Sequence, residues 1–317
     1  MPRQPRIEYE GATYHVINRG DRREDIVVDA ADRELLVRTL GEACARTDWQ
    51  VHAYCLMDNH FHVVVETPRP NLSAGMQWLL GTYTARFHRR HRTFGHLFSG
   101  RFKSLVVDAS NRGYLRTVCD YVHLNPIRAR LLAVGQPLRA YQWSSYPEYL
   151  KTPGQRAAWV RVDRLFGECG IAKDSVAGRR RFEQVMEERK GQERNHSSEA
   201  WKALRRGWCI GEEAFREELL ARVSAKQGDQ HYGEAVREAV EQKAERLVKE
   251  MLAAARVPES ELRRRRKGDA LKVRLATRLR QETTMTWKWI AARLAMGHWR
   301  SAANCVRLAE GARDKRR

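Results

Sequence analysis

The sequence predicts an α+β protein in which a mixed domain of strands and helices precedes a helical region. β-prone runs and amphipathic helical patterns alternate over residues 12–125, whereas residues 151–255 show helical patterns rich in Glu and Arg. The chain has 317 residues, of which 42% are hydrophobic, so it can bury more than one core. We therefore expect three regions, at residues 1–150, 151–255 and 256–317.

The first half of the mixed domain contains three β-prone runs and one helix. Residues 12–18 are β-prone, and residues 29–47 then carry apolar side chains at helical spacing. Two further β-prone runs, 49–57 and 60–67, are separated only by an Asp-Asn dipeptide. Both residue types tolerate positive φ, so this dipeptide predicts a two-residue hairpin turn.

The second half of the mixed domain repeats the helix and the strand. Asn71 or Ser73 can cap a helix that runs towards His91. Residues 100–108 are a fourth β-prone run, and residues 111–125 carry the spacing of a further helix. The order β-α-β-β-α-β is the ferredoxin-like arrangement, here with one extra helix at its end.

Membrane and disulfide classes are disfavoured by the sequence. No stretch approaches the ~18 to 20 consecutive apolar residues of a membrane-spanning helix, and the first residues lack the apolar region of a secretory signal. The six cysteines are spread singly, without a C-x-x-C pair, which argues against a zinc ribbon or a disulfide scaffold. We expect a cytoplasmic protein without a membrane partner.

Positive charge is concentrated near the C-terminus. The 59 Lys and Arg against 39 Asp and Glu give a net charge of +20. Residues 1–150 hold 20 basic and 15 acidic side chains, and residues 151–255 hold 21 and 18. Residues 256–317 hold 18 and 6, a net of +12. This distribution is typical of a module that binds a polyanion, appended to a less charged body.

The basic segment also carries a helical motif. Residues 282–308 predict two short helices joined by a three-residue turn that contains Gly297, with Ile290, Leu294 and Val306 as the core of a helix-turn-helix. The alternative is an ordinary helical hairpin with a solvated basic surface. If the segment is a helix-turn-helix, the side chains expected to contact DNA are Trp299, Arg300, Ser301, Asn304 and Arg307. A basic flank would add Arg263, Arg264, Arg265, Arg266 and Lys267.

A candidate metal site lies on the strand expected at residues 60–67. His60 and His62 alternate there with Phe61, so both imidazoles point to one face of the strand and can bind the same ion. A His-x-His pair is weak evidence by itself, because eight of the eleven histidines lie before residue 124. A third ligand is therefore needed from another element.

The helix expected at residues 111–125 offers two polar groups for this site. Tyr121 and Asn125 are four residues apart, so the phenol and the amide share one flank of the helix. The alternative is that Tyr121 packs at the edge of the domain and that Asn125 ends the helix, because the residue before a proline disfavours the α conformation.

Taken together, the motifs resemble a known family. YHVINRG at residues 14–20 is followed, in order and at plausible spacing, by MDNHFHVVV, GRFKS, YVHLNPIRA and WSSY. Residues 7–150 thereby resemble the single-tyrosine transposases of the HUH superfamily, and most closely the REP-associated tyrosine transposases of bacteria. The C-terminal motif resembles the helix-turn-helix of replication initiators of the DnaA type.

The transposase resemblance implies a ferredoxin-like HUH domain that acts on single-stranded or hairpin DNA. It implies that His60 and His62 hold a divalent metal, Mg²⁺ or Mn²⁺, and that Asn125 completes the metal site. It also implies that Tyr121 is the nucleophile.

The expected reaction cleaves DNA and rejoins it. Tyr121 attacks phosphorus to give a 5′-phosphotyrosine on one strand and a free 3′-hydroxyl on the other, and a second hydroxyl reverses the step. The covalent link conserves the energy, and the sequence contains no G-x-x-x-x-G-K-[ST] motif for binding a nucleotide phosphate. Arg101 and Lys103 could hold the DNA backbone, although a solvated strand face explains them equally well.

Two other functions stay open as alternatives. A domesticated hairpin-binding or regulatory protein is disfavoured because a pure DNA-binding protein has no need of His60, His62, Tyr121 and Asn125 together. A zinc hydrolase is disfavoured because no Glu or Asp accompanies the His-x-His pair in a clear motif. A homodimer is also open, with the tyrosine supplied by the same chain or by a partner.

Overall fold

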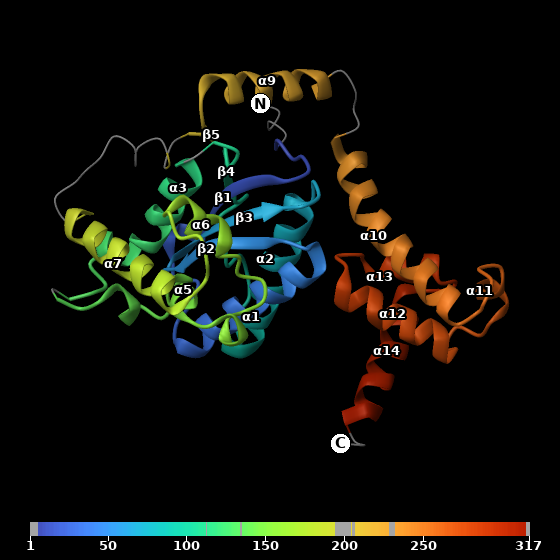
Figure 1. Cartoon of the computed structure of the whole chain (residues 1–317). Helices are drawn as coiled ribbons and strands as arrows, with labels where there is room; N and C mark the ends of the chain where they lie inside the picture. Colours follow the sequence, from blue (N-terminus) through green and yellow to red (C-terminus); the bar gives the residue numbers. More distant parts are fainter. Residues whose placement is uncertain are drawn as a thin grey trace. The chain divides into compact units, whose positions relative to one another are not determined.

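The computed structural model describes residues 6–111, 113–133, 135–193, 204, 207–227 and 232–314 (Figure 1). The chain folds into two compact units, residues 1–230 and 231–317. This division differs from the three expected regions. The described residues within 151–255 form no separate unit, because residues 151–193 contribute to the core of the first unit and the helix that begins at Tyr232 belongs to the second.

The predicted α+β class and strand order of the first unit are confirmed. The strands lie in one sheet in the order β2-β3-β1-β4-β5 (Figure 1). From β2 to β4 in this order, each strand is antiparallel to its neighbour. This is the order of a ferredoxin-like sheet with one added edge strand. The elements that build it are β1 (Ala12–Arg19), α1 (Ala30–Thr47), β2 (Gln50–Leu56), β3 (His60–Thr67), α2 (Leu72–His91) and β4 (Lys103–Val107).

Alternation along β3 separates the two faces of the sheet. On one face, Phe61 contacts the ring of Phe98, which in turn contacts Tyr83 of α2. On the other face, His62 contacts the ring of Tyr121. The helix α3 (Tyr114–His123) therefore covers the face that carries the histidines, and the opposite face packs against α2.

The ends of the helices follow local chemistry, with one difference from expectation. The Asp29 side chain accepts a hydrogen bond from the Asp32 backbone N–H at 2.9 Å and caps α1. Asn71 occupies the cap position of α2 without a capping bond. Its amide instead accepts a hydrogen bond from the Trp49 indole and donates one to the Thr47 carbonyl. Tertiary packing therefore uses the group that the sequence assigns to a cap.

The last predicted helix is divided in two. The α3 helix ends at His123, and Asn125 opens a separate short helix, α4 (Asn125–Arg128), with Pro126 in its first turn. The remaining elements of the unit are η1 (Asp21–Arg23), η2 (Leu138–Ala140), α5 (Tyr146–Leu150), η3 (Pro153–Gln155), α6 (Asp163–Glu168), α7 (Val176–Glu193) and α9 (Glu213–Gln227).

Irregular segments line the β2 edge of the sheet. The Leu56 backbone N–H donates to the Trp143 carbonyl at 2.8 Å, and the Ser145 N–H donates to the Tyr54 carbonyl at 2.9 Å. Further along β2, the Val51 N–H donates to the Trp159 carbonyl at 3.0 Å. The WSSY motif, residues 143–146, therefore has a structural role: its backbone is hydrogen-bonded to the edge strand β2.

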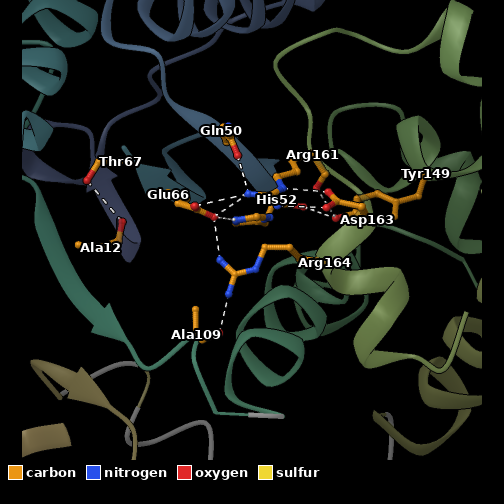
Figure 2. A network of polar contacts seen from close by, with 10 residues as sticks. All are labelled: Ala12, Gln50, His52, Glu66, Thr67, Ala109, Tyr149, Arg161, Asp163 and Arg164. Atoms are coloured by element: carbon orange, nitrogen blue, oxygen red, sulfur yellow. Dashed lines mark hydrogen bonds and ion pairs between the residues drawn. The ribbon is translucent and has the colours of Figure 1, made fainter. Parts of the chain in front are cut away.

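A polar network joins residues 161–164 to the same strands (Figure 2). Glu66 of β3 accepts a hydrogen bond from Arg164 at 2.8 Å and lies 3.0 Å from His52 Nε2. Arg161 donates to Gln50 at 2.7 Å. These contacts explain why the segment after residue 150 belongs to the first unit.

The opposite sheet edge carries a strand that the sequence analysis missed. Residues Cys209–Ile210 form β5 and pair in parallel with Val106 and Val107 of β4. Two residues are too few to show a strand periodicity, so no local pattern predicts this element.

The second unit is helical. Its hydrophobic cluster includes Leu275, Ile290, Leu294, Met296 and Val306. Its helices are α10 (Tyr232–Ala254), α11 (Glu261–Arg264), α12 (Ala270–Glu282), α13 (Trp287–Arg293) and α14 (Trp299–Asp314).

A buried lysine joins two connections of this unit. The Lys272 ammonium donates hydrogen bonds to the carbonyls of Arg265 and Ala295, each at 2.9 Å. Ala295 and Gly297 adopt positive φ in the connection between α13 and α14. Lys272 therefore ties this connection to the basic segment before α12. Across the described residues of both units, all six cysteines are free, and no helix has the length and apolarity needed to cross a membrane.

Candidate active site

Three histidines meet on the face of the sheet beneath α3. His60 and His62 project from β3 with ring centroids 5.0 Å apart. His15 projects from β1, and its ring stacks on that of His62 at 5.2 Å with an interplanar angle of 19°. His60 and His62 thus lie on one face of β3, as their alternation predicts. His15 is a third histidine at this site, which the sequence did not predict.

His15 contacts His62 through ring nitrogens. Its Nε2 lies 3.0 Å from Nδ1 of His62, and both side chains are buried. His15 belongs to the YHVINRG string but was not among the site residues predicted from the sequence. The antiparallel pairing of β1 with β3 sets His15 opposite Val64, two residues from His62, and this register is not visible in the sequence.

Burial keeps the three rings neutral. It lowers the pKa of His60 to about 4 and that of His15 to about 3, and it lowers the pKa of His62 well below its usual value. Neutral imidazole is the form that binds a metal ion, so the histidines are ready for this role near pH 7.

Tyr121 lies over these rings. Its side chain is 4% exposed, and its ring centroid is 5.7 Å from that of His62 and 5.7 Å from that of His15. The Arg128 guanidinium lies 4.1 Å from the Tyr121 ring centroid and donates a hydrogen bond to the Tyr121 carbonyl. Arg128 therefore fixes both the ring and the backbone of the tyrosine.

Helix α7 holds α3 and α4 in place. Arg128 of α4 forms an ion pair with Glu193 at 2.7 Å, and Arg189 forms one with Asp120 of α3. Both partners come from residues 151–255, for which the sequence predicts only helices rich in Glu and Arg. Their distance along the chain, about 65 to 69 residues, hides this support from any local pattern.

Asn125 is buried at the start of α4, and its Nδ2 atom has no hydrogen-bond partner among the described residues. A buried amide without a partner is unfavourable unless a ligand completes it. Rotation of the amide would present its oxygen, which is the atom that a divalent metal prefers.

The donor set fits a divalent metal. Nδ1 of His60 lies 2.7 Å from Asn59 Oδ1, and Nδ1 of His62 is engaged by His15, which leaves the Nε2 atom of each ring for a metal. No group of three His, Cys, Asp or Glu side chains arranged for a metal occurs in the described part of the chain. A metal held by His60 and His62 would need further ligands, and the Asn125 amide is the group that the sequence predicts for one of them.

The predicted DNA-contacting residues are at the surface. Arg101 and Lys103 are exposed where the chain enters β4, as are Trp299, Arg300, Ser301, Asn304 and Arg307 on α14. Arg263, Arg264, Arg266 and Lys267 are exposed too. Arg265 is half-buried and forms ion pairs with Glu261 at 3.1 Å and Asp269 at 3.5 Å, so its charge is used within the unit.

Part of the chain is similar to known transposases. Residues 8–125 match the family model described as "Transposase IS200 like". One solved structure similar to the chain is that of a REP-associated tyrosine transposase bound to a REP hairpin. It has a TM-score of 0.40 and 15% sequence identity, over 46% of this chain and 84% of the other. The comparison with curated proteins gave no match.

The family match spans β1 to Asn125 and so includes His15, His60, His62 and Tyr121. The similarity to IS200-like transposases thus covers residues 8–125, which hold the candidate site.

Proposed function

We propose that the protein is a metal-dependent DNA strand-transferase that cleaves single-stranded or hairpin DNA through Tyr121 and rejoins it. The observation that carries this proposal is the contact between the rings of Tyr121 on α3 and His62 on β3, with the ring of His60 beside that of His62. The ring centroids of His60 and His62 are 5.0 Å apart, and those of His62 and Tyr121 are 5.7 Å apart. A phenol and two neutral imidazoles beside one another supply a nucleophile and metal ligands.

In the proposed reaction, Tyr121 Oη attacks phosphorus and the bond from phosphorus to the 3′ oxygen breaks. The electron pair of that bond goes to the 3′ oxygen. The phenol loses one proton and the 3′ oxygen gains one, so the step is balanced. A 3′-hydroxyl reverses these steps, so joining restores the tyrosine and requires no external energy source.

The surrounding residues have distinct roles in this proposal. His60, His62 and Asn125 would hold Mg²⁺ or Mn²⁺, which supplies polarisation of the phosphoryl oxygens when bound. His15 orients the His62 ring, and Arg128 orients the phenol. Arg101 and Lys103 would hold the DNA backbone at the protein surface.

The second unit would add choice of DNA site. The exposure of Trp299, Arg300, Ser301, Asn304 and Arg307 on α14, after the short connection from α13, supports a helix-turn-helix. The exposed side chains of Arg263, Arg264, Arg266 and Lys267 support contacts with phosphates.

The direct test is trapping of the covalent intermediate. A labelled single-stranded oligonucleotide with a short hairpin, incubated with Mn²⁺, should give an adduct with the protein that resists SDS. Tyr121→Phe should abolish this adduct. Tyr114→Phe, at the start of the same helix, is the matched control and should retain it.

Two results would contradict the proposal. An adduct that persists in Tyr121→Phe would place the nucleophile elsewhere. Tight hairpin binding by the wild-type protein without any adduct would favour the alternative of a non-catalytic DNA-binding or regulatory protein.

A further inference from the structure

An isolated aromatic ring stands on the loop between α2 and β4. Phe94 is 96% exposed, the highest value among the large hydrophobic side chains that the structure describes. Full exposure of a phenyl ring is unfavourable in water, so a ligand that covers it would gain stability. The ring has no role in the core of the first unit.

The backbone around Phe94 is held on both sides. Nδ1 of His88 lies 2.8 Å from the Thr93 hydroxyl, and its Nε2 lies 3.1 Å from the Gly95 carbonyl. The Thr93 N–H also donates to the His88 carbonyl at 3.1 Å. These bonds fix the residues before and after Phe94 and hold the ring outward, as a pre-arranged contact requires.

The same loop is anchored beside the candidate active site. The Ser99 N–H donates to the Arg19 carbonyl at 2.9 Å, and the Asp21 N–H donates to the Leu97 carbonyl at 3.0 Å. Arg19 is the register partner of His60. The Phe94 loop therefore runs along the end of β1 next to the strand that presents the histidines.

The segment that carries the ring has an excess of positive charge, which suits a polyanion, and the two carboxylates that reach it, Asp29 and Asp32, are already paired with Arg90 and His91. No Asp or Glu occurs from residue 67 to residue 107. Arg89, Arg92, Arg101 and Lys103 are exposed and form no ion pair among the described residues. The adjacent residues 19–25 carry three Arg and three acidic side chains, so they do not reverse this charge.

We propose that Phe94 stacks on an unpaired base of the DNA strand that enters the active site, while the neighbouring cations hold its phosphates. This inference rests on the proposed function. Every base has a face on which an aromatic ring can stack, but the faces are covered in a duplex, so the contact selects single-stranded DNA. A protein partner fits less well, because Thr93, Gly95 and His96 around the ring are exposed without forming an apolar patch.

The experiment uses the full chain with Tyr121→Phe, which separates binding from cleavage. A single 2-aminopurine is placed in turn at each unpaired position beside the hairpin of an oligonucleotide. Stacking on Phe94 should quench the fluorescence at one or two adjacent positions. In Phe94→Ala this change should disappear, and the affinity for the oligonucleotide should fall about 5- to 150-fold.

Three controls make the result specific. Phe94→Trp should retain the affinity because the indole also stacks. Val176→Ala, which shortens another exposed apolar side chain, should leave it unchanged. A blunt duplex of equal length should bind Phe94→Ala and the parent equally well, and the thermal unfolding of the two proteins should coincide.

Unchanged single-strand affinity in Phe94→Ala would overturn the stacking role. Loss of self-association in that variant, without loss of DNA affinity, would overturn it too and identify the loop as a protein contact. Failure of the proposed function would be seen separately, as absence of the covalent adduct in the protein that keeps Tyr121.

Discussion

At the scale of residues, the site depends on contacts between side chains that are distant in sequence. His60 and His62 were predictable because alternation along a strand places residues two apart on one face. Tyr121 was a candidate for the site because of its position on the following helix, and the family resemblance then implied its role as nucleophile. His15 was not, since its contact with His62 depends on how β1 pairs with β3.

Replacement of His15 should weaken metal binding. Neutral His62 that offers Nε2 to a metal carries its proton on Nδ1, and His15 Nε2 is the acceptor for that proton. We expect His15→Phe to lower the affinity for Mn²⁺ about 10- to 100-fold, as measured by titration calorimetry. His15→Gln can still accept a hydrogen bond and should recover part of the loss.

The fold of both His15 variants must be compared by thermal unfolding. Equal Mn²⁺ affinity in His15→Phe and the wild type would show that His62 needs no orienting partner.

At the scale of elements, the packing of α2 against Trp49, the residue before β2, depends on the absence of one side chain. A Cβ atom at Gly75 would lie 2.2 Å from Trp49 Cζ2. We expect Gly75→Ala to destabilise the unit by about 1–3 kcal/mol, because the buried indole must move.

Gly81 in the same helix is the matched control. It is exposed, and a Cβ there meets nothing within 4 Å. Gly81→Ala should therefore stabilise the unit by about 0.5–1 kcal/mol through helix propensity. Urea denaturation measures both changes, and a stable Gly75→Ala would contradict the close packing.

The network between β3 and residues 161–164 predicts a pH effect on stability (Figure 2). Burial raises the pKa of Glu66, but hydrogen bonds from His52 and Arg164 offset this, and the folded pKa is about 2 against an ordinary value of 4.5. Because the folded pKa is the lower one, the stabilisation is complete above about pH 4.5 and is lost as the pH falls towards 2.

Glu66→Gln should lower the free energy of unfolding by about 1–2 kcal/mol at pH 7. The difference from the wild type should narrow between pH 4.5 and 2, as followed by urea denaturation at each pH. A difference independent of pH would mean that the charge of Glu66 contributes nothing to stability.

The elements themselves were predictable to different degrees. The first four strands and the first two helices follow from periodicity and turn residues, and the structure places them within a few residues of expectation. The short strand β5 and the ion pairs of α7 were not predictable, because each depends on pairing between distant segments.

At the scale of the whole molecule, the boundary of the second folded unit differs from the boundary of the basic region expected from the sequence. The concentration of positive charge after residue 255 was correct as a count. The unit that carries it begins earlier, at residue 231, because α10 packs into its core through Leu247, Val248 and Leu252. Charge alone does not show where a hydrophobic core begins.

The basic segment of the second unit should set the salt dependence of DNA binding. We expect replacement of four exposed cations by Gln, at Arg263, Arg264, Arg266 and Lys267, to reduce the slope of log K against log salt by about 3 to 4. The matched control replaces Arg180 and Arg181, which are exposed on α7. Fluorescence anisotropy at several salt concentrations measures the slope, and an unchanged slope would exclude phosphate contacts by this segment.

The outer sides of β4 and β2 are both paired with other segments of the chain. The Val106 N–H donates to the Trp208 carbonyl on one side, and Val51 and Leu56 donate to Trp159 and Trp143 on the other. A second molecule could not continue the sheet at these positions without first displacing native backbone. A homodimer would therefore not form by adding strands at Val51, Leu56 or Val106, and the same pairing limits aggregation by strand addition at these positions.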